Sequence, residues 1–319
     1  MIHADLITGF LGSGKTTFLK KYVRYLIDQG IHVGVLVNDY GAVNVDMLLV
    51  QELMGNDLCD IEMVIGGDYD CHRRRFKTKL IALAMSGCER VVIEPSGVYD
   101  VDEFFDVLHE EPLDRWYCPG NVIAIVDAQL PEELSQESDY FLVSQTADAG
   151  AVIMSRTQDA SAGEIESTLA HLNKAMQTYN CRRRFTSDVI TKPWDELSKE
   201  DLSTIASCGH RSESHVKMPF ERTNAYSTCY YMNLRIPLHE LQKITESIFN
   251  DPGCGNVIRI KGFMETADGW YDINASKDSM EARPVEKGQA VIVVIGENLK
   301  KDRLDAHWKQ NRTGDGSLS

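Results

Sequence analysis

The feature that most constrains the fold is a glycine-rich run near the start of the chain, Gly9-Phe10-Leu11-Gly12-Ser13-Gly14-Lys15-Thr16. It matches the pattern G-x-x-x-x-G-K-[ST], in which backbone N–H groups and a helix N-terminus surround phosphate oxygens. The pattern needs a strand before it and a helix after it. Residues 4–8 are apolar enough for a buried strand, and residues 15–29 carry apolar side chains at helical spacing. The sequence therefore predicts a strand–loop–helix unit that binds a nucleoside triphosphate.

Short apolar runs alternate with helical patterns through the first half of the chain, which is typical of a parallel sheet covered by helices. The predicted strands are residues 4–8, 33–38, 91–94, 122–127 and 151–155, and the predicted crossover helices are residues 15–29 and 73–85. We therefore predict an α/β fold, that of a P-loop NTPase with a largely parallel sheet flanked by helices.

The sequence turns polar and irregular after residue 186, and a second alternating pattern begins near residue 226. There we predict strands at 226–236, 257–266, 269–274 and 289–296, with helices at 238–250 and 300–308, in a mixed or antiparallel sheet. The predicted divisions are a nucleotide-binding domain (1–190), a connector (191–223), a smaller C-terminal α/β domain (224–310) and a disordered tail (311–319).

Composition narrows the possible partners. The 319 residues include 33 Lys and Arg against 48 Asp and Glu, a formal charge of −15, which argues against coating nucleic acid or an anionic membrane. No apolar run approaches the roughly 18 residues that a membrane span needs, and residues 1–5 do not begin a secretory signal. The eight cysteines are scattered without a C-x-x-C pair. We expect a cytoplasmic protein that binds neither nucleic acid nor membrane.

The loop pattern assigns roles to individual residues. Lys15 is expected to reach the β- and γ-phosphates and Thr16 to ligate Mg²⁺. Glu94, at the end of a predicted strand, is expected to hold the Mg²⁺ shell or orient the attacking water, with Asp39 as a further acidic candidate, and the Gly97 amide is expected to sense the γ-phosphate. The expected nucleotide contacts in the loop and helix start are Gly9, Gly12, Ser13, Gly14, Lys15, Thr16 and Thr17.

These motifs, together with several later ones, resemble the CobW-type family of P-loop GTPases. The resemblance rests on Thr8 to Leu19, Asn38-Asp39-Tyr40-Gly41, Glu94-Pro95-Ser96-Gly97, Val126-Asp127-Ala128, Arg259-Ile260-Lys261-Gly262-Phe263 and Val294-Ile295-Gly296-Glu297-Asn298-Leu299. It implies a CobW C-terminal-like second domain and slow GTP hydrolysis coupled to delivery of a transition metal to a client protein.

The chain departs from that family at the metal motif. Where members carry C-x-C-C, this sequence reads Asp68-Tyr69-Asp70-Cys71. Two carboxylates with one thiolate form a harder site, which could suit Zn²⁺, Fe²⁺, Mn²⁺ or Co²⁺. The following Arg73-Arg74-Arg75 favours a Cys71 thiolate but also repels a cation. The metal site Asp68, Asp70 and Cys71 therefore competes with a plainer interpretation, an acidic loop neutralised by a basic helix.

The second departure concerns the base. Guanine-specific members place N-K-x-D after a strand, whereas this chain reads Ser155-Arg156-Thr157-Gln158. Gln158 has one acceptor oxygen where an aspartate has two, so discrimination against adenine should weaken. GTP is the predicted substrate, ATP stays an alternative, and Ser155, Arg156 and Gln158 are the expected contacts to the nucleotide.

Two other functions compete with metal delivery. The lost thiolates and the altered base motif favour a nucleotide-switched module that binds a partner protein without transferring metal. A P-loop kinase would need a lid and a substrate pocket, which the sequence does not reveal. The sequence leaves open the client, the metal and whether the chain forms a homodimer.

Overall fold

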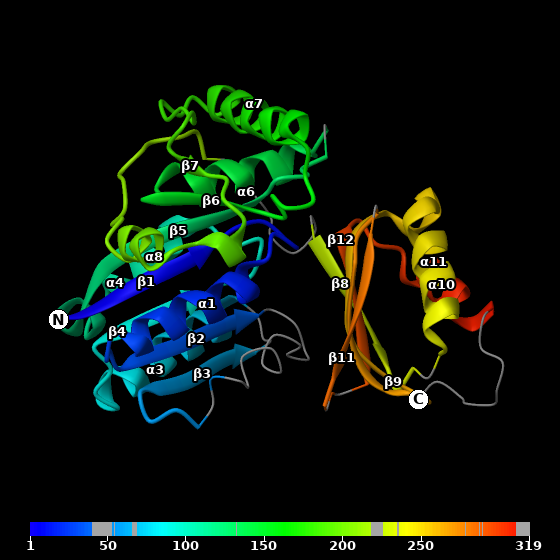
Figure 1. The fold of residues 1–319 in the computed structure, drawn as a ribbon, viewed down its shortest axis with the longest axis horizontal. Coiled ribbons are helices and arrows are strands. Elements are labelled where there is room, and N and C mark those ends of the chain that lie inside the picture. The colour runs from blue at the N-terminus through cyan, green and yellow to red at the C-terminus, as the bar shows by residue number, and fades with distance from the viewer. Residues whose placement is uncertain are drawn as a thin grey trace. The chain divides into compact units, whose positions relative to one another are not determined.

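The structure is a computed structural model of the 319-residue chain. It describes residues 1–39, 53, 55–65, 69–131, 133–217, 226–234, 236–277, 279–286, 288 and 290–310. The chain divides into two compact units, Met1–Met218 and Pro219–Ser319 (Figure 1), and each is described by itself below.

Seven strands form the sheet of the first unit in the order β3-β2-β4-β1-β5-β6-β7. They are β1 (Ile2–Thr8), β2 (Val33–Asp39), β3 (Cys59–Ile65), β4 (Arg90–Glu94), β5 (Tyr117–Asp127), β6 (Ala151–Ser155) and β7 (Val189–Ile190). Every described pairing in this sheet is parallel. The carboxyl ends of the strands therefore meet at one edge of the sheet, as the sequence predicted for a P-loop NTPase fold.

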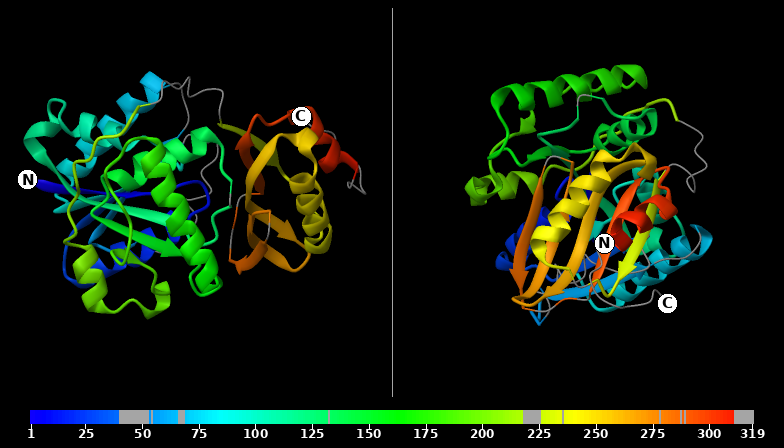
Figure 2. Two further views of the ribbon diagram at one scale, coloured as in Figure 1. Left: turned by 90° about the horizontal axis from the view of Figure 1, so that it is seen from above. Right: turned by 90° about the vertical axis from the view of Figure 1, so that its right-hand side faces the viewer.

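Helices cover both faces of this sheet (Figure 2). They are α1 (Lys15–Asp28), α3 (Tyr69–Met85), α4 (Val101–Leu108), α5 (Leu113–Trp116), α6 (Gln136–Ala147), α7 (Ala162–Thr178) and α8 (Lys199–Ile205), with the short 3₁₀ turn η2 (Trp194–Glu196). The apolar side of α1, which includes Phe18 and Leu19, packs with Ile7 and Val35 of the sheet in one buried cluster. Alternation of strand and helix thus buries both faces of the sheet.

Residues 191–217 lie with the first unit. Leu197, Leu202 and Ile205 belong to the same buried cluster as α1 and the sheet. The first part of the stretch that the sequence suggested as a connector therefore contributes to the core. The division of the chain into domains otherwise stays a prediction, and its proposed disordered tail at 311–319 lies outside the described residues.

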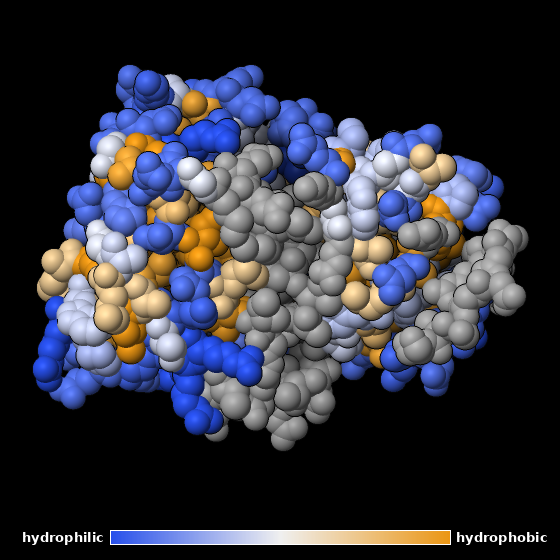
Figure 3. All heavy atoms as spheres, turned by 90° about the horizontal axis from the view of Figure 1, so that it is seen from below, coloured by the Kyte–Doolittle hydropathy of each residue, from blue (hydrophilic) through white to orange (hydrophobic). Residues whose placement is uncertain are grey.

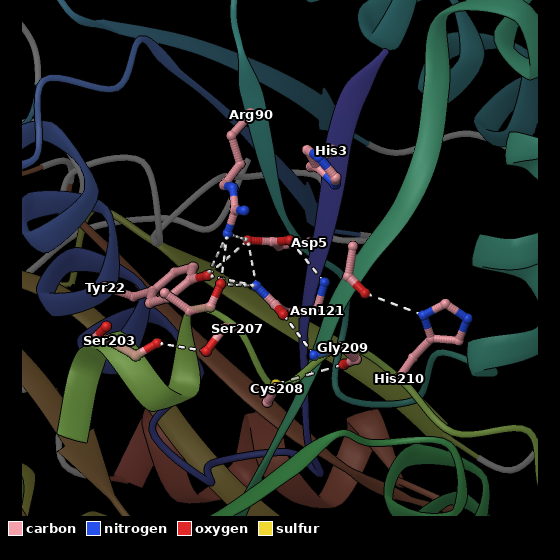
Figure 4. A network of polar contacts seen from close by, with 12 residues as sticks. His3, Asp5, Tyr22, Arg90, Asn121, Ser203, Ser207, Cys208, Gly209 and His210 are labelled. Carbon is pink, nitrogen blue, oxygen red and sulfur yellow. Dashed lines mark hydrogen bonds and ion pairs between the residues drawn. The ribbon is translucent and has the colours of Figure 1, made fainter. Parts of the chain in front are cut away.

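A buried polar network holds this segment onto the amino ends of the strands (Figure 4). Asp5 accepts hydrogen bonds from the Tyr22 hydroxyl (2.7 Å), from Arg90 Nη1 (3.0 Å) and from the backbone N–H of Asn121 (2.8 Å). Asn121 in turn donates to the carbonyl of Ala206 and accepts from the N–H of Gly209, at 2.9 and 2.7 Å. Burial raises the pKa of Asp5, and the Arg90 charge opposes that rise. The network joins three strands, α1 and the chain after α8.

The second unit is a five-stranded antiparallel sheet in the order β11-β10-β9-β12-β8. Its elements are β8 (Tyr226–Met232), α10 (Leu238–Asn250), the 3₁₀ turn η3 (Pro252–Cys254), β9 (Asn256–Thr266), β10 (Gly269–Ala275), β11 (Met280–Val285), β12 (Val291–Glu297) and α11 (Lys301–Gln310). Of the two sheet types predicted, the antiparallel one is found. β8 ends at Met232, four residues before the predicted strand end at 236, and β11 was not predicted.

Among the described residues, no helix is long and apolar enough to cross a membrane. On the face drawn in Figure 3, hydrophobic surface is interrupted by hydrophilic side chains.

Candidate functional site

The glycine-rich loop leaves the carboxyl end of β1 and ends at the first turn of α1. Gly9, Gly12 and Gly14 all have positive φ angles, of 146, 82 and 92°. A side chain at Gly9 would place its Cβ 2.2 Å from the carbonyl oxygen of Ile125, so only glycine fits there. Gly14 precedes α1 without a side-chain cap. The first N–H groups of the helix are therefore left to bind an anion.

Lys15 is buried beneath this loop, with 8% of its surface exposed. Its Nζ donates to the carbonyl oxygens of Gly9 (2.9 Å) and Phe10 (3.3 Å). The ammonium group is thus held inside the curve of the loop. Thr17, the third residue of α1, is exposed.

Thr16 and Glu94 meet, as the predicted Mg²⁺ site requires. The Thr16 hydroxyl donates to Glu94 Oε1 at 2.6 Å, although 78 residues separate them in the chain. Glu94 ends β4 and only 4% of it is exposed. A hydroxyl and a carboxylate at the mouth of a phosphate-binding loop are the oxygen ligands that Mg²⁺ prefers.

Two further hydroxyl groups near the loop are buried and have no hydrogen-bond partner among the described residues: Thr8 Oγ1 and Ser13 Oγ. Buried polar atoms are normally paired, and an unpaired one calls for an unseen partner. Phosphate oxygens or metal-bound water would satisfy both hydroxyls. The residues present therefore fit a Mg²⁺–nucleotide complex.

Gly97 lies directly against the loop. A Cβ at this position would be 2.6 Å from the backbone nitrogen of Leu11, so only glycine allows the approach. The fully buried Gln145 of α6 donates to the Gly97 carbonyl at 2.8 Å. Sequence reasoning missed Gln145, because nothing near it in the chain indicates a contact 48 residues away.

Arg156 links the end of β6 to the loop. It has a positive φ of 55°, forms an ion pair with Asp127 at the end of β5, and donates from Nη2 to the Gly12 carbonyl at 3.2 Å. Ser155 is buried beside it. Gln158 is exposed and donates to Asp159 at 2.8 Å, which leaves its contact with a base as a prediction.

Trp194 is a second residue that sequence reasoning missed. Its indole Nε1 donates to the carbonyl of Met154 at 2.9 Å, and its ring meets that of Phe18 edge-on at 5.4 Å. A Cβ at Gly14 would lie 3.1 Å from the indole. The ring therefore lies against the start of α1, beside the carboxyl end of β6. The polar sequence around Trp194 gives no indication of these contacts.

The expected cargo-metal residues are only partly described. Asp68 lies outside the described residues, and Asp70 and Cys71 lie in the first turn of α3 without described side chains. The same holds for the side chain of Asp39, the last residue of β2. Their roles stay predictions.

The basic start of α3 is better defined. Arg73 forms an ion pair with Glu110 at 2.5 Å, so part of the positive charge expected to repel a cation is already compensated. His72 is buried, and burial, with a contribution from Arg75, lowers its pKa to about 4. Its imidazole is therefore neutral at pH 7.

The parallel sheet, the glycine-rich loop and the Thr16–Glu94 pair define a P-loop nucleotide-binding fold. Comparison with known families agrees. Residues 3–186 match the nucleotide-binding domain of CobW/HypB/UreG, and residues 229–312 match the cobalamin synthesis protein CobW C-terminal domain. The chain belongs to the CobW/HypB/UreG family.

Two curated relatives from Escherichia coli (strain K12) share modest identity with the chain. It is 30% identical to the zinc chaperone YjiA over 193 residues, 56% of this chain and 57% of YjiA. It is 28% identical to the zinc chaperone YeiR over 171 residues, 53% of this chain and 50% of YeiR. The chain thus spans about half the length of the curated relatives it matches.

A crystal structure of Zn(II)-bound YjiA GTPase from E. coli aligns over 98% of this chain and 99% of that one. The identity is 19% and the TM-score 0.35.

Proposed function

We propose that this chain is a Mg²⁺-dependent GTPase whose slow hydrolysis controls delivery of a transition metal, zinc first, to a client protein. Membership of the CobW/HypB/UreG family supports the nucleotide half of the proposal. The names of the two relatives, both zinc chaperones, support the metal half.

The contact of Thr16 with Glu94 carries the nucleotide half. It brings a hydroxyl and a carboxylate to the same edge of the sheet as the buried hydroxyl of Ser13, which has no hydrogen-bond partner within the described part of the chain. Thr16 and Glu94 would hold Mg²⁺, which when bound neutralises charge on the β- and γ-phosphates. Lys15 would exchange the loop carbonyls of Gly9 and Phe10 for phosphate oxygens and stabilise charge that develops in the transition state.

The topology supports a connection between nucleotide and metal. β2 and β3 pair in parallel, with Asp39 opposite Ile65 in the register. β3 therefore ends beside Asp39, at the edge of the sheet where the phosphate-binding loop also lies, and Asp68, Asp70 and Cys71 follow β3 in the chain. We assign Asp39 a role in the response to the γ-phosphate, and we assign the three donors after β3 to the cargo metal. Loss of the γ-phosphate on hydrolysis would then change the coordination of the metal.

The proposal takes GTP as the substrate, with ATP as the alternative that Gln158 leaves open. Arg156, held by Asp127 and Gly12, would border the nucleotide. The seven cysteines whose side chains are described are all free, which suits a reducing compartment such as the cytosol. A client metalloprotein and a homodimer around the nucleotide are further parts of the proposal.

The test is the reciprocal effect of nucleotide on zinc binding. We would measure the zinc affinity of the full chain by competition with a chromophoric chelator, with Mg²⁺ and either GDP or a non-hydrolysable GTP analogue. We expect the two affinities to differ by about tenfold or more. Cys71→Ser should remove that difference, and Cys118→Ser, which changes a thiol far along the chain, should retain it. Equal affinities in the wild type would contradict metal delivery and favour a nucleotide-switched module that binds a partner.

A further inference from the structure

Three metal-ligating side chains meet at the amino ends of neighbouring strands. His32 immediately precedes β2, Asp60 is the second residue of β3, and Cys88 lies two residues before β4. His32 Nε2 is 2.9 Å from Asp60 Oδ2, and Cys88 Sγ is 3.6 Å from the same oxygen. All three donor atoms lie within 4.8 Å of one another.

The sheet topology explains why residues so far apart in the chain converge. β3, β2 and β4 are adjacent and parallel, and Val33 pairs with both Cys59 and Arg90. The segments that enter these strands therefore lie side by side. Gly34 makes room for the sulfur, because a Cβ there would be 3.1 Å from Cys88 Sγ.

The spacing suits a tetrahedral ion. Zinc binds nitrogen and oxygen at about 2.0 to 2.2 Å and sulfur at about 2.3 Å, so its ligand atoms stand roughly 3.3 to 3.6 Å apart. Small side-chain rotations would bring the His32, Asp60 and Cys88 donors to that spacing. Cys88 is buried, whereas the side chains of His32 and Asp60 are 23 and 44% exposed, so an ion can enter from solvent.

The charges around the cluster also favour a cation. Among the described residues, no lysine or arginine forms an ion pair with Asp60, whose recorded ionic partner is His32. The Ser86 hydroxyl lies 3.3 Å from Cys88 Sγ and is a neutral contact of the cluster. The backbone N–H of His32 donates to Glu89 Oε1 at 3.3 Å. A second carboxylate, that of Glu89, thus stands beside the histidine.

A cluster of the same three residue types in the second unit provides a contrast. Asp251, Cys254 and His307 are equally close together, with 2.9 Å between His307 Nε2 and Asp251 Oδ2. There Arg303 pairs with Asp251 at 3.1 Å, so a cation already compensates the carboxylate. We do not assign a metal to that cluster.

We propose that His32, Asp60 and Cys88 form a site for a borderline-soft divalent transition metal of the Zn²⁺ class, with the fourth position open to solvent. One thiolate, one imidazole and one carboxylate are ligands that zinc accepts, and three protein ligands leave a position for exchange. The site lies at the amino end of β3, whereas Asp68, Asp70 and Cys71 follow its carboxyl end in the chain, and β3 itself is about 20 Å long over its seven residues. It requires neither the nucleotide nor those three residues.

The test uses Co²⁺ as a probe, because a thiolate bound to cobalt gives a charge-transfer absorption in the near ultraviolet. The full chain carrying Cys71→Ser, without nucleotide, would be titrated with Co²⁺ and then with Zn²⁺. We expect a thiolate–cobalt band that saturates at one ion per chain and that Zn²⁺ removes. Because Cys71 is absent throughout, this result is independent of whether the cargo site of the proposed function exists.

Three further variants in that background locate the site. Adding Cys88→Ser should abolish the band. Adding Asp60→Asn, which keeps the shape of the side chain and removes its charge, should weaken cobalt binding at least tenfold. Cys254→Ser is the matched control and should leave the band unchanged. The proposal is overturned if Cys71→Ser shows no band, if the band survives Cys88→Ser, or if it disappears with Cys254→Ser.

Discussion

Buried polar groups lie at both ends of the seven-stranded sheet, but they have different partners. At the amino ends, Asp5, Tyr22, Arg90 and Asn121 bond to one another and to the backbone after α8. At the carboxyl ends, the hydroxyls of Thr8 and Ser13 are just as buried and have no partner among the described residues.

The difference separates buried polar groups that hold the fold together from buried polar groups that are available to a ligand. A buried polar group costs stability unless it is paired. Hydrogen bonds within the fold offset that cost for Asp5, whereas Ser13 Oγ has no such partner among the described residues. His32, Asp60 and Cys88 are an intermediate case, since they lie at the structural end, contact one another, and remain open to solvent.

The strongest test of the carboxyl end is Lys15→Ala. Loss of the Lys15 ammonium, which is held beneath the loop, should reduce GTP turnover about a thousandfold, equivalent to about 4 kcal/mol of transition-state stabilisation. Turnover would be measured as phosphate release. Lys21→Ala, which removes the same charge from a half-exposed position on α1, should leave it within a factor of two. A Lys15→Ala rate near that of the wild type would remove the loop from the chemistry.

The corresponding test of the amino end is Asn121→Ala. The change leaves Gly209 N–H, the Ala206 carbonyl and Asp5 with fewer partners in a buried region, and should lower the free energy of unfolding by about 3 kcal/mol. Urea denaturation would measure the free energy of unfolding. The control is Ser207→Ala, an exposed change in the same segment, whose free energy of unfolding should stay within about 0.5 kcal/mol of the wild type. Nucleotide affinity should be unchanged in both. A loss of affinity as large as the loss of stability would break the distinction between the two ends.

The smallest expected effect concerns the base. Gln158→Asp supplies a second acceptor oxygen for the guanine N–H groups and should raise the ratio of GTP to ATP affinity about tenfold. Competition against a fluorescent nucleotide would measure the ratio. Asp159→Asn changes the neighbouring acid and should leave it nearly constant; an unaltered ratio in Gln158→Asp would place the base elsewhere.

The sequence predicted most of the first sheet because residues 91–94, 122–127 and 151–155, in β4, β5 and β6, are nearly continuous apolar runs that are buried in the sheet. The sequence did not predict β3, because acidic residues at 60 and 62 interrupt its apolar pattern. β3 lies at the edge of the sheet, where charged side chains are tolerated. The sequence did not predict α6 either, because this helix is buried around most of its circumference and shows no amphipathic stripe.

The residues of the candidate site also differ in whether the sequence could predict them. The loop and Glu94 follow from local motifs, because the backbone geometry that holds phosphate demands glycines and a lysine at fixed spacing. Gln145, Trp194 and the triad His32, Asp60 and Cys88 depend on contacts between distant segments. Their spacing in the chain gives no sign of those contacts. Strand order brings the triad together, and packing of α6 and η2 against the sheet places Gln145 and Trp194.

The most direct test of the central claim, that the nucleotide occupies the carboxyl end of the sheet, is amide hydrogen exchange of the full chain with and without a Mg²⁺–GTP analogue. We predict slower exchange in peptides that cover residues 9–19 and 94–99. Peptides that cover residues 118–121 and 206–210, at the amino end, should exchange at the same rate in both states. Unchanged exchange in residues 9–19 at saturating nucleotide, or protection confined to the amino end, would contradict the account.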